Sequence, residues 1–447
     1  MKSLSFLEAG LCALIVIAPL PFGSVGPAGR LTLELIALTL TAAWAVIALR
    51  NEVATPPRAA CFAFLGLLAI AAIQLVPVGA AFVSAVSPHA AALRAGLDPA
   101  PDPTLSLAPG ATASALRTGC ALVGIVFVAT SVVAARGTTR IALAAAAAAA
   151  FQGLYGLLVL ASGHARIWNV PKTAYLDSAT GTFVNRNHFA GFLAATLPLG
   201  VGLVVAAARR AKLRSRMPGA LSTALGTDGS KALLLGLLVL TGFAGLLLSF
   251  SRAGTALGLG AVVGTAAVVV RRRPLHRAAV IAIVVAIAAV PLLDLGADRL
   301  FARYADSSAD FTVSGGRLDV AADTLRMIAG FPATGCGFGA FTWVYPAFSS
   351  PGVRMHYTHA HDDLLQLGAE GGVLALALLL VALVAVSRAA LRVLRDGSDP
   401  VATGAVFGLS ALLMHGLVDF NFHIPANAAI AAVLSGVLFG VTWNGRR

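Results

Sequence analysis

The chain has 447 residues, of which 58% are hydrophobic and only 11% are charged, and its mean hydropathy is +0.87. Soluble proteins carry roughly 25% charged residues, so this chain lacks the polar side chains that would cover a water-exposed surface. The composition therefore excludes an ordinary soluble protein and predicts a polytopic membrane protein. A net charge of +13 would indicate nucleic-acid binding in a soluble protein, so the positions of the basic residues decide what the charge means.

Apolar segments long enough to cross a bilayer recur along the whole chain. A helix needs about 20 apolar residues to cross a hydrocarbon core about 30 Å thick. We expect the third of these segments to break after Pro77 and continue as an interfacial piece. By this measure twelve spans are predicted, at residues 4–22, 31–49, 59–86, 115–135, 141–161, 187–208, 232–250, 253–270, 278–295, 364–386, 401–417 and 426–443.

The basic residues gather in alternate connections between these spans. If the N-terminus is cytoplasmic, the cytoplasmic connections and tails hold most of the 32 Lys and Arg residues, including Arg271–Arg273 and the cluster at 209–216. This is the positive-inside pattern of membrane proteins. The positive charge is therefore interpreted as a determinant of topology and of contact with anionic lipids, and no nucleic-acid partner is expected.

The spans divide the chain into three parts. Residues 1–295 are expected to carry transmembrane helices 1–9, and residues 364–447 helices 10–12. Between them, residues 296–363 form a large loop on the outer side, with short helices such as 318–329. Most of the polar residues that could support chemistry lie on this side.

Two arginines stand where apolar spans begin on the outer side. Arg186 lies in segment 181–188, Gly-Thr-Phe-Val-Asn-Arg-Asn-His, and Arg252 lies between the seventh and eighth spans. A charge at a helix centre costs roughly 2.5–3.5 kcal/mol on insertion scales, so each arginine needs a reason. They serve either as interfacial anchors and caps or as a clamp for an anion, because a guanidinium group matches phosphate oxygens. If the arginines form a clamp, we expect it to hold a diphosphate at the membrane surface.

A polar cluster marks the point where the large loop re-enters the membrane. At about 100° per residue, His359, Asp363, Gln366 and Glu370 share one narrow face of an otherwise apolar helix. Such a face turns toward a cavity or a partner helix. If Asp362 is instead the N-cap, the neighbouring histidine lies just before the helix and is free to face a substrate.

That histidine, His361, allows three interpretations. Imidazole titrates near neutral pH, so His361 can act as a general base toward an attacking hydroxyl. Together with His359 and the two adjacent aspartates it also offers ligands suited to a metal. The third interpretation is structural, through capping and hydrogen bonds. The outer turn that contains Asp419, Asn421 and His423 is interpreted as a hydrogen-bonded turn rather than as a reactive site.

These motifs, in this order, resemble those of the O-antigen ligase and polymerase superfamily. Segment 180–191 resembles the family's Gly-Thr-Phe-x-Asn-x-Asn motif, and Ser251–Gly254 resembles its Ser-Arg-x-Gly motif. Gly316-Arg317, 332–341 and 361–372 resemble the outer loop and its closing His-Asn-x-x-Leu-Gln…Glu-x-Gly element. The resemblance covers about residues 180–425, and the first third of the chain matches only as hydrophobic spans. This chain departs from the family with Asp362 in place of the common asparagine and Leu364 in place of a common aromatic residue.

The resemblance implies an all-α integral membrane protein with GT-C-like architecture and a large periplasmic loop. It implies a multi-pass protein of the bacterial inner membrane, with both termini cytoplasmic and the active site periplasmic. The implied partners are an undecaprenyl-pyrophosphate-linked glycan as donor, a glycan or lipid A core as acceptor, and membrane lipids.

The resemblance also implies roles for single residues. His361 is catalytic, and Arg186 and Arg252 bind the donor pyrophosphate. We expect inverting transfer without a metal or other cofactor, in which His361 accepts the proton of an acceptor hydroxyl that attacks the anomeric carbon. Asp363 or Glu370 would orient the imidazole or hold the acceptor. The expected supporting residues are Asn185, Asn187, His188, Arg317, His359, Asp363, Gln366 and Glu370.

Two further functions compete with a ligase. One is a polymerase of the same superfamily, which extends one lipid-linked glycan with another. The other is a transporter or flippase of lipid-linked sugars, which twelve spans would also suit. The charged residues lie at the outer ends of the predicted spans rather than at the membrane midplane, and this favours the enzyme.

Overall fold

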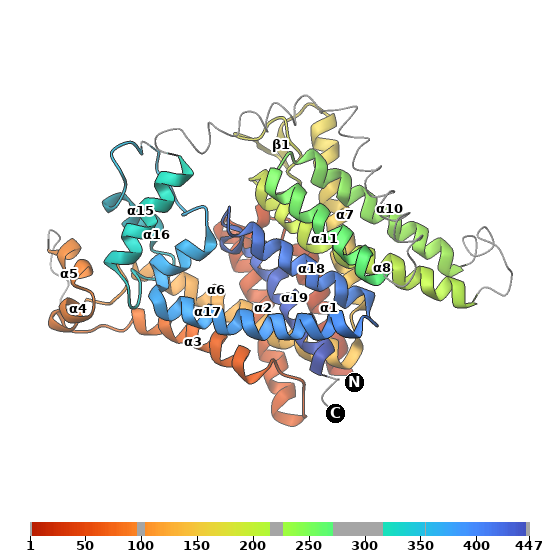
Figure 1. Cartoon of the computed structure of the whole chain (residues 1–447), viewed down its shortest axis with the longest axis horizontal. Helices are drawn as coiled ribbons and strands as arrows, with labels where there is room; N and C mark the ends of the chain where they lie inside the picture. Colours follow the sequence, from red (N-terminus) through yellow and green to blue (C-terminus); the bar gives the residue numbers. More distant parts are fainter. Residues whose placement is uncertain (1, 96–102, 215–226, 271–315, 354, 444–447) are drawn as a thin grey trace.

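The computed structural model describes residues 2–95, 103–214, 227–270, 316–353 and 355–443, and helices account for nearly all of its regular structure (Figure 1). The long helices are α1 (Lys2–Ile17), α2 (Pro27–Arg50), α3 (Arg58–Gln74), α6 (Pro109–Arg136), α7 (Thr139–Ala161), α8 (Arg186–Arg214), α10 (Thr227–Leu248), α11 (Arg252–Val269), α17 (Asp363–Asp396), α18 (Pro400–His415) and α19 (Pro425–Trp443). The short elements are η1 (Phe22–Ser24), α4 (Ala80–Val86), α5 (Pro88–Arg94), β1 (Arg166–Ile167), β2 (Val170–Pro171), α15 (Arg317–Gly330), α16 (Phe341–Val344), η2 (Tyr345–Ala347) and η3 (Asn421–His423).

The long helices make this a membrane protein. Eight of the described helices are long and apolar enough to cross a bilayer, and α1, α3 and α18 are shorter apolar helices. Together they coincide with eleven of the twelve predicted segments. The other predicted segment, 278–295, lies outside the described residues.

Proline and glycine set several boundaries that differ from the predicted ones. The first helix ends at Ile17, before Pro19 and Pro21, so it is shorter than the predicted span 4–22. The third helix ends at Gln74, and the separate helix α4 follows Pro77, as the sequence indicated. Strands β1 and β2 form an antiparallel hairpin that pairs Ile167 with Val170, a small exception to the expected all-α fold.

The helix α8 lies at the centre of the packing. It contacts α7, α10, α11 and α18, and small residues allow the backbones to approach closely. A Cβ atom on Gly404 or Gly408 of α18 would collide with backbone atoms of α8. The helix α19 is almost entirely buried and packs along α6. These contacts hold the beginning of α8 and the end of α18 in fixed relative positions.

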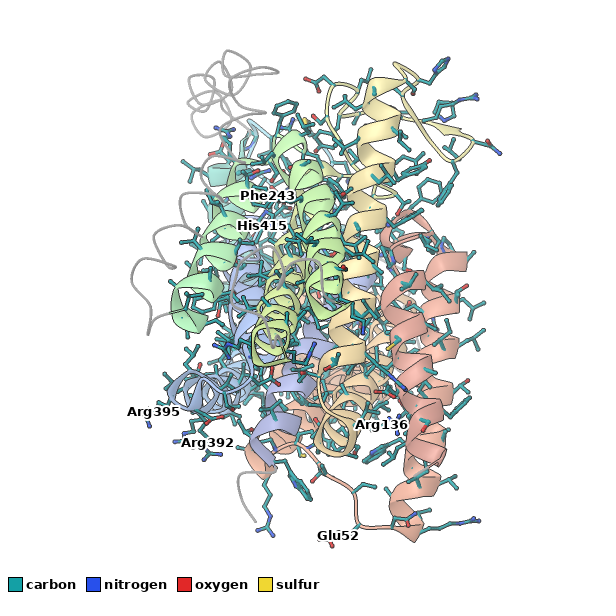
Figure 2. All side chains as sticks on the ribbon, turned by 90° about the vertical axis from the view of Figure 1, so that its right-hand side faces the viewer. Glu52, Arg136, Phe243, Arg392, Arg395 and His415 are labelled. Atoms are coloured by element: carbon teal, nitrogen blue, oxygen red, sulfur yellow. The ribbon has the colours of Figure 1, made fainter. Side chains whose placement is uncertain are left out.

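The two ends of the helical bundle differ in composition. Figure 2 shows Glu52, Arg136, Arg392 and Arg395 toward one end of the bundle, away from His415. At the opposite end, α15 and α16 share a separate hydrophobic core with α4, α5 and the first turns of α17, in which Phe331, Phe341 and Tyr345 are buried. Figure 1 shows α15 and α16 grouped beside the beginning of α17. The described part of the large loop is therefore a small helical unit packed at that end.

Candidate active site

A buried glutamine fixes the segment that precedes α8. Oε1 of Gln152 in α7 accepts a hydrogen bond from the backbone N–H of Thr182 (2.9 Å), and Nε2 donates to the Thr182 hydroxyl (2.9 Å). That hydroxyl donates in turn to the carbonyl of Pro19 (2.6 Å). Gly181 has a φ of +52°, and a Cβ atom there would collide with Gln152, so the position requires glycine. The Gly-Thr-Phe motif thus serves to position the start of α8.

Arg186 is the first residue of α8. Oδ1 of Asn185 caps this end by accepting the N–H of Asn187 at 2.8 Å. The guanidinium carbon of Arg186 lies 5.0 Å from the centre of the Tyr175 ring, a cation–π contact, and Nη1 lies 3.5 Å from the Ser178 hydroxyl. Its buried Nε makes no hydrogen bond to any described residue. The side chain is therefore held in place, and its Nε–H group remains available to donate a hydrogen bond to a ligand.

Arg252 begins α11 in the same way. Oγ of the N-cap Ser251 accepts the N–H of Gly254 (3.3 Å), and the backbone N–H of Ala179 bonds to the carbonyl of Leu248 (2.8 Å). The second bond ties the segment before α8 to the segment before α11. A Cβ atom on Gly254 would collide with that of Ala190, which lies one turn after the start of α8. The two arginines therefore begin neighbouring helices at the same end, where both helix dipoles present positive charge.

His361 lies immediately before α17. Oδ1 of Asp362 accepts the N–H groups of Leu364 and Leu365 at 2.9 Å each and is the N-cap, so His361 is outside the helix. This agrees with the alternative from the sequence in which Asp362 is the N-cap and His361 lies just before the helix. His361 has a left-handed backbone with a φ of +55°. The plane of its ring is nearly perpendicular to the rings of Tyr357 (87°) and Phe420 (77°), which are T-shaped contacts.

The carboxylate that pairs with His361 comes from a turn that the sequence analysis interpreted as structural. Oδ1 of Asp419 lies 3.7 Å from Nδ1 of His361 and 3.5 Å from Nε2 of His188, slightly beyond hydrogen-bond distance. Oδ2 accepts a hydrogen bond from Nδ2 of Asn187 at 2.8 Å. Burial would raise the pKa of Asp419, but His188, His361 and His415 hold this pKa well below its usual range. Asp419 is therefore a buried carboxylate at neutral pH.

The two carboxylates that were expected to orient His361 have other partners. Oδ1 of Asp363 lies 2.8 Å from Nδ1 of His423, and Oδ2 accepts the N–H of Phe422. Glu370 accepts the N–H groups of Gly339 (2.8 Å) and Phe341 (3.2 Å). Both therefore bind the neighbouring turn and loop. The carboxylate that lies near Nδ1 of His361 is instead that of Asp419, at 3.7 Å.

The polar face of α17 continues through Gln366 and His359. The Gln366 amide donates to Oε1 of Glu370 (3.1 Å) and accepts the N–H of Ala360 (3.1 Å), and it lies 3.2 Å from Nδ1 of His359. Burial, and then the charge of His423, lower the pKa of His359 to about 3. His359 is thus neutral and stacks on Phe420, with ring centres 4.3 Å apart. The polar face of α17 therefore binds the outer loop and the turn that contains His423.

The metal interpretation of this cluster is not supported. Asp362 caps α17 and Asp363 binds His423, so the two aspartates do not converge with His359 and His361 on one point. The described part of the chain contains no group of three or more His, Cys, Asp or Glu side chains placed to hold a metal.

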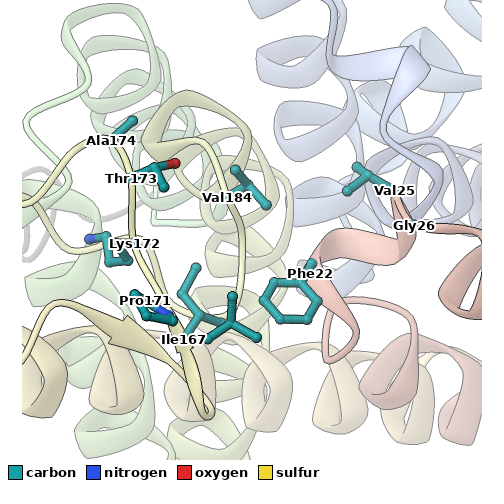
Figure 3. Close-up of a pocket in the computed structure, with 10 residues that line it drawn as sticks. Phe22, Val25, Gly26, Ile167, Pro171, Lys172, Thr173, Ala174 and Val184 are labelled. Carbon is teal, nitrogen blue, oxygen red and sulfur yellow. The ribbon is translucent and has the colours of Figure 1, made fainter.

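Two further features border the site. Nη1 of Arg317, the first residue of α15, donates to the carbonyl of Val418 (3.1 Å), which brings a third arginine beside the Asp419 turn. A hollow with a volume of about 390 Å³ lies between the η1 turn and the β-hairpin loop (Figure 3). Phe22, Ile167 and Val184 point into it from both sides, and Val184 is two residues before Arg186. An apolar hollow therefore adjoins the segment that carries the first arginine.

A comparison with known protein families finds a match over part of the chain. Residues 237–380 match the family described as O-antigen ligase. This segment contains Arg252, Arg317 and His361, and the match confirms the resemblance to that superfamily. No curated protein matches the chain.

Proposed function

We propose that this membrane protein of the O-antigen ligase superfamily transfers a glycan from undecaprenyl pyrophosphate to an acceptor hydroxyl, at the periplasmic face of the bacterial inner membrane. The observation that carries the proposal is the convergence of the His361–Asp419 pair with the arginine-bearing ends of α8 and α11. A Cβ atom on Gly254 of α11 would lie 3.2 Å from Cε1 of His415, at the end of α18 and four residues before Asp419. This contact supports placing the arginines beside the base.

The pair supports proton transfer from an acceptor. Nδ1 of His361 is directed to Asp419, so Nε2 is the nitrogen that accepts the proton of an acceptor sugar hydroxyl. The charge of Asp419 stabilises the imidazolium that forms. The hydroxyl oxygen then forms a bond to the anomeric carbon of the donor as the bond to the pyrophosphate oxygen breaks, which inverts the configuration.

The arginines support departure of the leaving group. Undecaprenyl pyrophosphate takes the electron pair of the broken bond, and negative charge grows on its bridging oxygen. Arg186, Arg252 and the positive ends of α8 and α11 stabilise this charge more strongly in the transition state than in the ground state. The apolar hollow beside Val184 offers room for part of the donor lipid.

Acceptor choice distinguishes the two members of this class. A ligase transfers the glycan to lipid A core, and a polymerase transfers it to a second lipid-linked glycan. Both use the same donor chemistry, and we place the ligase first. Arg186 and Arg252 are the first residues of α8 and α11, and the His361–Asp419 pair lies outside the long helices. These positions at helix ends argue against a transporter, whose substrate site lies near the midplane.

A reconstituted transfer assay tests the proposal. Purified wild-type protein is mixed with undecaprenyl-pyrophosphate-linked glycan and either lipid A core or a second lipid-linked glycan, with and without chelator. We expect glycan transfer that survives the chelator, and loss of product in His361→Ala, Arg186→Ala and Arg252→Ala. Arg395→Ala, at the other end of the bundle, is the matched control and should retain activity. Longer lipid-linked ladders would identify a polymerase, and absence of transfer to either acceptor would refute the proposal.

A further inference from the structure

A second charged cluster lies toward the end of the bundle that carries Arg136, away from His415 (Figure 2). Glu8 of α1 is buried, and its Oε2 accepts hydrogen bonds from Nε of Arg136 (2.6 Å) and Nη1 of Arg140 (2.8 Å). These arginines stand at the end of α6 and the start of α7. Two positive charges meet one negative charge, so the cluster keeps a net charge of +1. The proposed glycosyl transfer uses none of these residues.

A hollow of about 370 Å³ opens at this cluster, lined by Glu8, Ala135, Arg136, Thr139 and Arg140. Only one nitrogen of each guanidinium group bonds to Glu8, so the other N–H groups have no partner among the described residues. The side chain of Arg140 is 65% exposed, which leaves it accessible to a ligand. The hollow is therefore lined by unused donors suited to phosphate oxygens.

The beginning of α7 adds to the positive potential. Its N-cap, Thr138, makes no side-chain capping bond, because its hydroxyl donates to Oδ2 of Asp399 at 3.0 Å. The first N–H groups of α7 are thus left without a side-chain cap beside the hollow. A helix start with unsatisfied N–H groups favours an anion.

An apolar track leads away from the hollow along α7. Leu143 (47% exposed), Phe151, Leu154 and Leu158 are exposed and follow Arg140 at helical spacing on one face. On the neighbouring helix α1, Phe6 is 58% exposed. This apolar surface can contact the acyl chain of a lipid, whereas a soluble anion would make no favourable contact with it.

We propose that this hollow binds the phosphate headgroup of an anionic phospholipid of the cytoplasmic leaflet, with an acyl chain along the exposed face of α7. The positive-inside distribution of the sequence assigns this end to the cytoplasm. Anionic lipids attract basic residues there. Glu8 holds the two guanidinium groups beside each other, because both donate to its Oε2, and it sets the strength of the site by cancelling one of the two charges.

Lipid binding to the full-length protein in detergent tests the proposal, read by native mass spectrometry and by the shift in unfolding temperature. We expect phosphatidylglycerol to bind more tightly than phosphatidylcholine. Arg140→Gln should weaken phosphatidylglycerol binding about fivefold through loss of one interfacial charge. Glu8→Gln should strengthen it, because the net charge of the cluster rises. Arg395→Gln, an exposed arginine at the same end, should leave the binding unchanged.

Parallel experiments distinguish a lipid phosphate from a soluble phosphate as the ligand. Inorganic phosphate and glycerol phosphate should stabilise the protein much less than phosphatidylglycerol, and Leu143→Ser should weaken binding of the lipid alone. If phosphate stabilises the protein as well as the lipid does, the site is for a soluble anion and the proposal fails. It also fails if Arg140→Gln and Arg395→Gln lose binding equally, or if Glu8→Gln weakens binding.

Discussion

The backbone at His361 adopts a left-handed conformation with a φ of +55°, which residues other than glycine seldom take. Such strain costs on the order of 1–3 kcal/mol and persists only where the surroundings impose it. Here the surroundings are the Asp362 cap on one side and the rings of Tyr357 and Phe420 on the other. The conformation places the imidazole beside Asp419 instead of on the polar face of α17. Strain is thus stored where the proposed chemistry requires a fixed base.

Asp419→Asn should reduce kcat strongly and leave KM for the donor nearly unchanged. The amide keeps the size of the side chain but removes the charge that stabilises the imidazolium of His361, and general-base catalysis contributes about 100-fold or more. Steady-state kinetics of glycan transfer measure this. Asp399→Asn, at the opposite end of α18, is the control, because asparagine still caps the helix and full activity is expected. Equal losses in both variants would show a structural role only.

The His423–Asp363 pair should make stability depend on pH. Partial burial would lower the pKa of His423, but its hydrogen bond with Asp363 and the charge of that group raise the pKa above the usual value of about 6.5. The protonated pair therefore stabilises the fold fully below about pH 6.5, and this contribution is lost as the pH rises through the raised pKa.

We expect the unfolding temperature of the wild type in detergent to fall as the pH rises above about 6.5 and through the raised pKa of His423, and to fall less in His423→Gln. Scanning fluorimetry at a series of pH values above about 6.5 measures both curves. His164→Gln, a change at an exposed loop histidine, should keep the pH dependence of the wild type. Parallel curves for wild type and His423→Gln would contradict the assignment.

At the scale of the element, the outer loop is joined to α17 by backbone contact. Backbone N–H groups of Cys336 and Gly337 bond to the carbonyls of Ala369 and Glu370, and the Gln74 amide bridges the same region from α3. Gly335 has a φ of +71°, and a Cβ atom there would collide with the backbone of Glu370. The Gly-Cys-Gly-Phe-Gly run is thus a close-contact loop that positions the start of α17.

Gly335→Ala should lower stability by about 2 kcal/mol or more and reduce transfer activity with it. The positive φ and the backbone collision act together, so the loop must move away from α17. Gly260→Ala is the matched control, because no atom outside its own helix lies within 4 Å of a Cβ atom there. Alanine in a helix is favoured over glycine by up to about 1 kcal/mol, so this variant should be as stable as the wild type or more so. Thermal unfolding distinguishes them.

Over the whole molecule, Arg136, Arg392 and Arg395 lie toward one end of the bundle, away from His415, which borders the candidate site (Figure 2). From the positive-inside pattern we propose that this end is cytoplasmic. In a variant without the four native cysteines, Leu176→Cys should react with an impermeant maleimide added to spheroplasts. Glu52→Cys should react only after the membrane is broken. The reverse result would invert the topology and place the site in the cytoplasm.

Much of the architecture was predictable from the chain alone. Apolar length and the positions of Pro77 and the basic clusters are local properties, so eleven predicted spans coincide with described helices, and the break after the third helix was anticipated. The order of the motifs around Arg186, Arg252 and His361 likewise indicated the superfamily that residues 237–380 match. These features depend on the hydrophobicity and the residue order of short segments, and both can be determined from the sequence alone.

Only the tertiary structure revealed the partner of His361. Asp419 lies 58 positions away along the chain, in a short Asp-Phe-Asn-Phe-His turn whose composition is typical of turn hydrogen bonds. Asp363 and Glu370 lie much closer in sequence and were expected to fill this role, but they bind a turn and a loop that contact α17. Helical periodicity determines which residues share a face of α17. It cannot determine which distant segment packs against that face, because this depends on the packing of α8, α11 and α18 as a whole.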